Sequence, residues 1–157
     1  MKTEFWMIGK TNEAYLKEGI AIFEKRIKRY IPFESVIWPD IKNAGKMDVA
    51  MLKQKEGQMI LSKLEPKHYL ILLDEQGKVF SSVAFAKYFE GLQQRSYKRV
   101  VFLVGGAFGF SDEIYQRANQ KISLSDMTFS HQMVRLFFTE QLYRALSILH
   151  NEPYHNA

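Results

Sequence analysis

Short apolar runs alternate with amphipathic stretches along almost the whole chain. Five runs have the length and composition of buried strands: residues 4–9, 33–38, 68–73, 99–104 and 122–125. Apolar residues at three- and four-residue steps fill the intervals between them. This spacing predicts helices over residues 13–31, 48–64 and 83–95, a short helix from Ser111, and a long closing helix over 131–149.

Cap and turn residues support this division. Asn12 fits the N-cap of the first helix, and either Ser81 or Ser82 fits that of the third. Pro32 ends the first helix, because proline cannot continue the helical hydrogen bonding. Alternating helices and strands, with strands apolar on both faces, predict an α/β fold with a mainly parallel sheet. Since no repeat, linker or composition break occurs, we expect one domain over residues 1–157.

The composition narrows the possible functions. Of the 157 residues, 46% are hydrophobic, which is enough for a buried core and excludes a disordered chain. The lack of cysteine excludes disulfides, a thiol nucleophile and cysteine-ligated metals, and the four histidines show no ligand spacing, so we expect no metal. A net charge of +5 fits a polyanionic partner. Without a signal-peptide pattern or a long apolar window, we expect a soluble cytoplasmic protein with no membrane partner.

Glycines lie between a strand and a helix start in residues 104–114, VGGAFGFSDEI. Glycines allow a positive φ or a close approach of backbone to a ligand, and a helix N-terminus offers free N–H groups. The stretch lacks the Lys-Ser/Thr of a P-loop and is not GxGxxG, although Asp126 lies near the spacing of the acidic residue in dinucleotide-binding folds. It is therefore either a cofactor loop or only a tight turn.

A carboxylate and a glycine follow another strand in residues 72–78, LLDEQGK. In open α/β sheets, ligands bind outside the carboxyl ends of the strands, where this segment and the glycine loop both lie. Alone, residues 74–78 fit a simple turn. Together, the two loops predict a pocket at this edge of the sheet.

The closing helix carries an apolar stripe with polar residues beside it. The stripe comprises Val134, Phe138, Gln141, Leu142, Ala145 and Leu149, which fits a core or a dimer interface. His131 and Arg135 lie one turn apart, and Glu140 and Arg144 form an i,i+4 pair. That pair is either a surface ion pair or part of a site, and His131 either bonds local backbone or has a function.

The last residues include Pro153, Tyr154 and His155. Chain ends often fray, so these residues fit an unstructured tail. A tyrosine can also stack on a nucleobase, and a histidine can contact phosphate or transfer a proton. Both readings of the tail remain open.

Several of these motifs occur together in one known family. LVGGAFG, LDEQGK, and LSDMTFSHQMVRLFFTEQLYRA followed by PYH strongly resemble the bacterial ribosomal RNA large subunit methyltransferase H family. That family belongs to the SPOUT superfamily of α/β-knot methyltransferases, and the similarity runs over the whole chain. It implies a SPOUT fold whose C-terminal part forms a trefoil knot around the cofactor pocket. It also implies methyl transfer from S-adenosylmethionine to N3 of a pseudouridine in the helix 69 loop of 23S rRNA, on the assembled ribosome.

The resemblance further implies which residues form the site. The cofactor pocket would use Leu73, Gly105, Gly106, Leu124, Ser125, Asp126, Met127, Thr128 and Phe129. The substrate side would use His131, Arg135, Tyr143, Arg144, Tyr154 and His155, with catalytic roles expected for all of these except Tyr143. His155 is the candidate general base or substrate-orienting group. Ser130 departs from the family's usual proline, and the tail ends in Asn156–Ala157 rather than in a basic residue.

Two alternative functions remain open. The first is a SPOUT methyltransferase for another RNA base, and the second is a non-catalytic RNA- or ribosome-binding module. In each case the closing helix is apolar on more than one face, through Met133, Leu136 and Phe137 beside the stripe. One face can pack on the sheet and another on a second copy, which predicts a homodimer.

Overall fold

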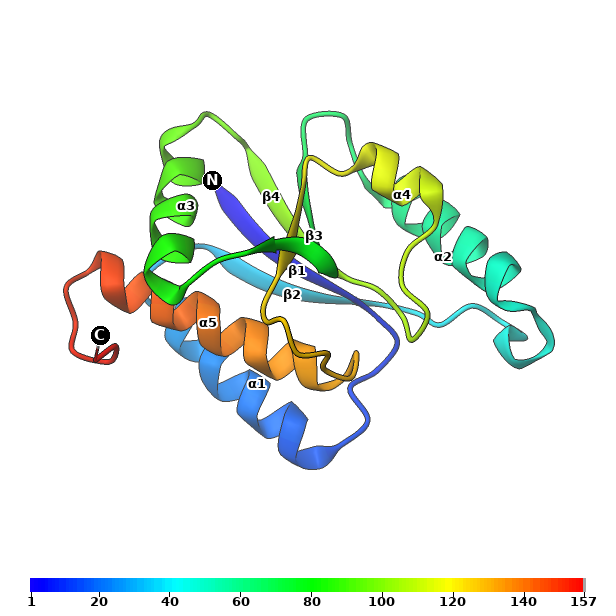
Figure 1. Ribbon diagram of the computed structural model, residues 1–157, viewed down its shortest axis with the longest axis horizontal. Coiled ribbons are helices and arrows are strands. Elements are labelled where there is room, and N and C mark those ends of the chain that lie inside the picture. The colour runs from blue at the N-terminus through cyan, green and yellow to red at the C-terminus, as the bar shows by residue number, and fades with distance from the viewer. Residues whose placement is uncertain (157) are drawn as a thin grey trace.

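A five-stranded parallel sheet lies at the centre of the protein, with helices packed on both of its faces (Figure 1). The computed structural model describes residues 1–156. The strands are β1 (Lys2–Ile8), β2 (Phe33–Trp38), β3 (Tyr69–Val79), β4 (Arg99–Val104) and β5 (Gln120–Ser123). They stand in the order β2-β1-β4-β3-β5, and each neighbouring pair is parallel. The prediction of an α/β fold with a mainly parallel sheet is confirmed.

Helices connect the strands and divide between the two faces. They are α1 (Ala14–Ile27), α2 (Val49–Lys63), α3 (Ser82–Gln94), α4 (Asp112–Arg117) and α5 (Met133–Leu149), with a short 3-10 turn, η1 (Ala44–Lys46). α1, α3 and α5 cover one face, and α2 and α4 cover the other (Figure 1). Because helices cover both faces, the inner strands are buried on both sides and read as continuous apolar runs.

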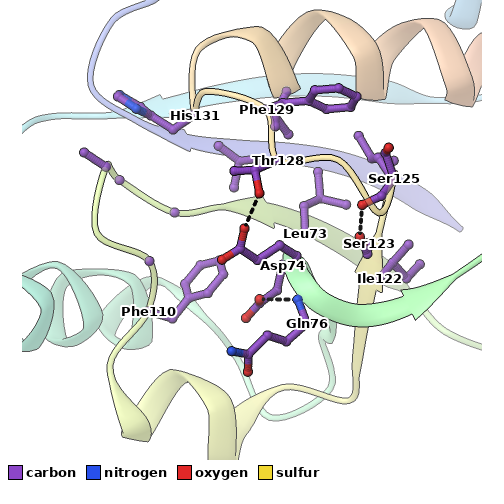
Figure 2. Close-up of a pocket in the computed structure, with 18 of the residues that line it drawn as sticks. Leu73, Asp74, Gln76, Phe110, Ile122, Ser123, Ser125, Thr128, Phe129 and His131 are labelled. Atoms are coloured by element: carbon purple, nitrogen blue, oxygen red, sulfur yellow. Dashed lines mark hydrogen bonds between the residues drawn. The ribbon is translucent and has the colours of Figure 1, made fainter.

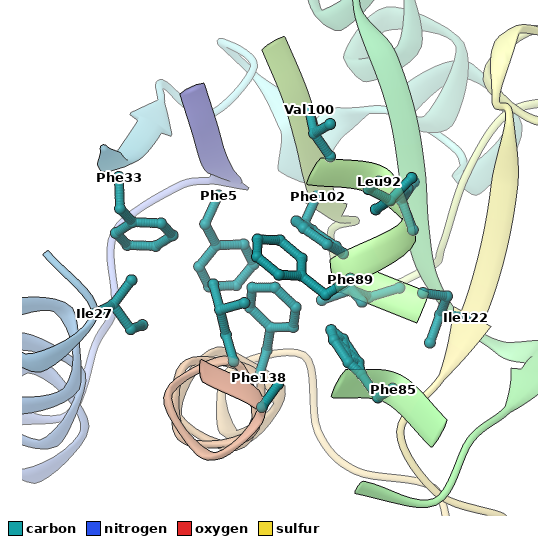
Figure 3. Close-up of a cluster of buried hydrophobic side chains, with 14 of the residues drawn as sticks. Phe5, Ile27, Phe33, Phe85, Phe89, Leu92, Val100, Phe102, Ile122 and Phe138 are labelled. Carbon is teal, nitrogen blue, oxygen red and sulfur yellow. The ribbon is translucent and has the colours of Figure 1, made fainter. Parts of the chain in front are cut away.

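Aromatic rings fill the layer between the sheet and α5 (Figure 3). Phe138 on α5 is fully buried, and its ring centroid lies 4.6 Å from that of Phe5 and 4.8 Å from that of Phe102. Phe85 and Phe89 from α3 stack on Phe102 as well. These contacts fix α5 against the middle of the sheet.

Serine caps begin two of the helices as predicted. The Ser81 hydroxyl accepts a hydrogen bond from the Ala84 backbone N–H, and the Ser111 hydroxyl accepts one from the Ile114 N–H. These bonds satisfy N–H groups that have no partner within the helix.

The prediction for Asn12 is wrong. The first helix begins at Ala14 after Glu13, and no side chain caps it. The Asn12 backbone N–H instead donates to the Gln132 side chain, 120 residues further on. A tertiary contact therefore fixes the loop that local cap preference assigned to the helix start.

β3 is longer than the apolar run in the sequence. Residues 74–78, predicted as a turn, continue the strand to Val79. The register against β5 shifts between Leu73 and Lys78, so the intervening residues bulge out of the ladder. The turn prediction is corrected because the polar residues occupy a bulged strand rather than a reversal of the chain.

β5 begins earlier than predicted, over residues 120–123 instead of 122–125. It runs very close to the second half of β3. A Cβ at Gly77 would lie 2.6 Å from the backbone nitrogen of Ile122, so only glycine permits this approach.

We predict that Phe138→Ala lowers the free energy of unfolding by about 3–5 kcal/mol, because it leaves a cavity between α5 and the sheet. Urea denaturation at fixed protein concentration measures the change. Val83→Ala, at a side chain that is 50% exposed on α3, is the matched control and should change stability little. Equal effects of the two substitutions would contradict the central role of Phe138.

Candidate active site

A cavity of about 440 Å³ lies where β4 and β5 end, beside the bulge in β3 (Figure 2). Its apolar wall includes Leu73, Val104, Phe110, Ile122 and Phe129. The bulged part of β3, the glycine loop after β4 and the chain between β5 and α5 all contribute to it. The two loops singled out in the sequence thus meet at one pocket, at the edge of the sheet where parallel strands place ligands.

The structure brings most of the expected pocket residues together. The lining includes Leu73, Gly105, Gly106, Leu124, Ser125, Met127, Thr128 and Phe129. It also includes His131, which was expected on the substrate side. Asp126 is the exception: it is exposed and does not line the cavity. Ser125 turns the chain there, since its hydroxyl accepts from the Met127 N–H while its carbonyl accepts from Ser123.

The glycine loop is shaped by packing. Gly109, not Gly105 or Gly106, has the positive φ, at +85°. A Cβ on Gly105 would lie 3.1 Å from the Phe110 ring, and one on Gly106 would lie 2.8 Å from Oε2 of Glu56. The absence of side chains at Gly105 and Gly106 therefore leaves room for the Phe110 ring and the Glu56 carboxylate.

Acidic residues from β3 form a rim that the site predictions did not include. Tyr115 donates a hydrogen bond to Asp74. The Thr128 hydroxyl donates one to Glu75 at 3.0 Å (Figure 2). The Asp74 carboxylate and burial raise the pKa of Tyr115 well above its usual value, with burial the larger cause. The only sequence signal for this rim was the pair of carboxylates in LLDEQGK.

Ser130 starts the closing helix. Its hydroxyl accepts from the Met133 N–H at 3.1 Å, and the helix begins at Met133 rather than at His131. His131 precedes the helix and is one of the residues that line the cavity. Burial and the nearby Arg135 cation lower the pKa of His131, so its neutral form is favoured.

Arg135 lies beneath the site and is completely buried. Its Nη1 donates to the Gly9 carbonyl at 2.8 Å and to the Thr11 hydroxyl at 3.0 Å, and its Nη2 donates to the Ile8 carbonyl at 2.9 Å. Burial lowers the pKa of Arg135, although the group stays charged. In this chain Arg135 fastens the end of β1 to α5 and does not face the cavity.

The remaining expected residues gather at the other end of α5. Arg144 pairs with Glu140 at 2.6 Å, and Tyr154 donates to the same carboxylate at 3.1 Å. The Arg144 guanidinium lies 4.7 Å from the centre of the Tyr154 ring, which in turn packs edge-on against Tyr143. The tail therefore folds back onto the helix through residue 155.

The arrangement of His155 determines where its ring carries hydrogen. Nη1 of Arg144 lies 3.0 Å from Nδ1 of His155. A guanidinium can only donate, so Nδ1 is the acceptor and the neutral ring carries its hydrogen on Nε2. His155 is thereby oriented to donate from Nε2.

The two groups of expected residues are separated along one helix. Val134 lines the cavity, whereas Arg144 lies ten residues later in α5. At a rise of 1.5 Å per residue, these positions are about 15 Å apart. We call Tyr143, Arg144, Tyr154 and His155 the Arg144 group. One chain does not bring its own Arg144 group to its own cavity.

Glu56 on α2 is a neighbour of the glycine loop that no sequence pattern indicated. Among residues 1–156 its carboxylate makes no side-chain hydrogen bond or ion pair by ordinary distance criteria. Burial, and to a smaller extent the Asp40 charge, raise the pKa of Glu56 to about 7. In the sequence, Glu56 lies among polar residues of an amphipathic helix and looks like an ordinary solvent-exposed glutamate.

The described residues carry neither of two other common features. Residues 1–156 contain no group of three or more histidine, aspartate or glutamate side chains placed to hold a metal ion. None of the helices they form is long and apolar enough to cross a membrane.

A parallel α/β sheet with a glycine-lined cavity between its last strands and the closing helix defines a class of protein. The family model described as "Predicted SPOUT methyltransferase" matches residues 1–155. The chain belongs to the SPOUT methyltransferase family.

Curated relatives narrow the class further. Three proteins named ribosomal RNA large subunit methyltransferase H are similar over nearly their whole length. That of Parabacteroides distasonis is 52% identical over 156 residues, covering 99% of both chains. That of Christiangramia forsetii is 52% identical over 149 residues, covering 95% of both. That of Cytophaga hutchinsonii is 50% identical over 156 residues, covering 99% of this chain and all of its own. The resemblance found in the motifs is confirmed.

We predict that Glu56→Gln stabilises the protein at pH 8 more than at pH 5.5. The native pKa of Glu56 is raised to about 7 from 4.5. The unfolded state therefore loses its proton first, and stability falls as pH rises from about 4.5 to about 7. Glutamine removes this loss, so the difference in Tm, variant minus wild type, should be larger at pH 8. Thermal unfolding followed by circular dichroism measures it, and an equal difference at both pH values would contradict the raised pKa.

Proposed function

We propose that the protein transfers the methyl group of S-adenosylmethionine to N3 of a pseudouridine in the helix 69 loop of 23S rRNA, within the ribosome. The observation that carries the proposal is the cavity at the carboxyl edge of the sheet, in a SPOUT chain whose curated relatives are ribosomal RNA methyltransferases. The net charge of +5 suits a phosphate-rich substrate.

The lining of the cavity fits S-adenosylmethionine chemically. Apolar side chains such as Leu73, Ile122 and Phe129 suit an adenine ring, with backbone groups of the glycine loop and of residues 124–129 beside them. The carboxylates of Asp74 and Glu75 suit hydroxyl groups and positive charge. When bound, the molecule supplies an activated methyl group on a cationic sulfur, so alignment and exclusion of water are the main tasks of the protein.

The Arg144 group suits the other reactant. N3 of pseudouridine lies between two carbonyl groups, whose oxygens gain negative charge as the N3 proton leaves. Arg144 and Nε2–H of His155 are donors that can hydrogen-bond these oxygens. Tyr154 adds an aromatic face for the base. Of the two roles considered for His155, its hydrogen bonding favours orientation of the substrate over proton removal.

Because the cavity and the Arg144 group lie about 15 Å apart in one chain, we propose that two copies combine them. In a homodimer, the tail of one subunit would meet the cavity of its partner. α5 has partly exposed apolar side chains for such a contact, including Phe137, which is 37% exposed. Arg135 would act as a positioning residue, since it ties the loop after β1 to the start of α5.

The function is tested by incubating the purified protein with S-adenosylmethionine and with ribosomes that lack the modification. Mass spectrometry of 23S rRNA fragments should find one added methyl group on the helix 69 pseudouridine. A methyl group on another base would indicate a different SPOUT activity. Absence of both transfer and cofactor binding would favour a non-catalytic ribosome-binding module.

We predict that His155→Ala slows methyl transfer at least about ten-fold without weakening binding of S-adenosylmethionine, because the tail does not line the cavity of its own chain. Tyr154→Phe should have a smaller effect, since it keeps the aromatic face. Single-turnover methyl incorporation and calorimetry measure the two properties. A parallel loss of cofactor affinity would contradict the division of the site.

We predict that two inactive variants complement each other when mixed. Arg144→Ala removes the donor group, and Leu73→Arg obstructs the cavity, which contains Leu73 in its wall. A mixed dimer retains one cavity and one Arg144 group that can face each other, so activity should return after subunits exchange. Analytical ultracentrifugation checks that each variant is a dimer. Failure of exchanged dimers to recover activity would show that one subunit supplies both parts.

A further inference from the structure

Methyl transfer to N3 requires an acceptor for the N3 proton, and the Arg144 group does not supply one. Nδ1 of His155 already accepts from the Arg144 guanidinium, and Nε2 carries the hydrogen of the neutral ring. A second proton on His155 would have to enter at Nδ1, facing a cation at 3.0 Å. The geometry assigns donation, not proton acceptance, to this group.

The groups lining the cavity are also poor acceptors. The Asp74 and Glu75 carboxylates already accept hydrogen bonds from Tyr115 and Thr128. Burial, and to a smaller extent the Arg135 cation, lower the pKa of His131 and so oppose its protonation. Asp126, although acidic, is exposed to solvent in the chain between β5 and α5.

Glu56 differs from all of these. It is partly buried, makes no side-chain hydrogen bond within residues 1–156, and lies against the glycine loop. Its Oε2 and Oε1 lie 2.8 and 3.1 Å from the position of a Cβ on Gly106, and Gly106 lines the cavity. Glu56 does not itself line the cavity; because Gly106 has no side chain, the Glu56 carboxylate packs directly against this residue of the loop that does.

We propose that Glu56 is the general base of the reaction, an inference that rests on the proposed function. The Glu56 carboxylate of the subunit that holds the methyl donor takes the proton from N3 of the base. The N3 electron pair forms the new bond to the methyl carbon while the carbon–sulfur bond breaks, and its electron pair stays on sulfur. S-adenosylhomocysteine and N3-methylpseudouridine are the products, and Glu56 then releases the proton to water.

The charges around Glu56 suit this role. Burial and Asp40 raise its pKa to about 7, near the pH at which a base is both ionised and able to accept a proton. Lys53 on α2 lines the same small hollow as Glu56. Asp40 lies in the loop after β2, and its negative charge also favours the charged forms of His131 and Arg135. A desolvated carboxylate without a partner costs stability, which a catalytic role explains.

Glu56→Gln tests the proposal, because glutamine keeps the shape but cannot take the proton. In single-turnover assays from pH 6 to pH 9, the wild-type rate should rise with pH through the pKa of Glu56 and then level off. Glu56→Gln should be slower by about 100-fold or more at pH 8 and should lose this rise. Its affinity for S-adenosylmethionine, measured by calorimetry, should stay within about three-fold of wild type.

Two further variants sharpen the test. Glu90→Gln makes the same change at an exposed position on α3 and should leave rate, pH profile and affinity unchanged. Asp40→Asn removes the charge that raises the pKa of Glu56, so the midpoint of the rise should move to lower pH while the plateau rate is kept. This variant tests the assignment independently of Glu56→Gln.

The possible outcomes separate the two proposals. If the wild type modifies the pseudouridine and Glu56→Gln does so at the same rate, Glu56 is not the base and the proposed function stands. An unshifted midpoint in Asp40→Asn would likewise overturn the assignment. If the wild type transfers no methyl group to rRNA, the proposed function itself fails.

Discussion

The arrangement of the site depends on one buried cation. Arg135 bonds the last carbonyls of β1 and the loop that follows, so it joins the first strand to the last helix across more than 120 residues. Removing one partner from such a buried polar network commonly costs several kcal/mol, because the remaining groups lose their hydrogen bonds. Gln132, three residues earlier, strengthens the same junction: its side chain accepts from the Asn12 N–H and donates to the Lys10 carbonyl. Through this junction the start of α5, and with it His131, is held at the cavity.

Much of the fold could be predicted from the sequence because burial leaves a strong pattern. Strands covered on both faces read as apolar runs, and serine side chains mark helix starts such as those after Ser81 and Ser111. The errors occurred where distant contacts outweighed local preference. Asn12 has the character of a cap, yet its N–H is taken by Gln132. Residues 74–78 have the composition of a turn, yet they pair with β5 as a bulged strand.

The site was predictable where motifs contribute backbone or neighbouring side chains, as at Gly105, Gly106 and residues 124–129. Motif resemblance could not show which residues are close in one chain, and the structure separates His155 from the cavity. Glu56 escaped prediction for a related reason. Its unusual properties come from burial against Gly106 and from Asp40, two residues far from it in sequence. The trefoil knot implied by the resemblance stays a prediction.

The continuous strand β3 has a consequence for how a ligand enters. Its first half forms part of the floor of the cavity at Leu73, and its bulged continuation carries the acidic rim, with Gly77 held against β5. Strand pairing on either side of the bulge, and the hydrogen bonds that Asp74 accepts from Tyr115 and from the Gln76 N–H, fix this part of the wall when the protein folds. Little backbone entropy therefore remains to be lost there on binding. Any widening of the entrance must then come from the opposite side, where Met127 is 77% exposed in the chain between β5 and α5. The cavity has one rigid wall and one adaptable wall, and the rigid wall sets the orientation in which a ligand is held.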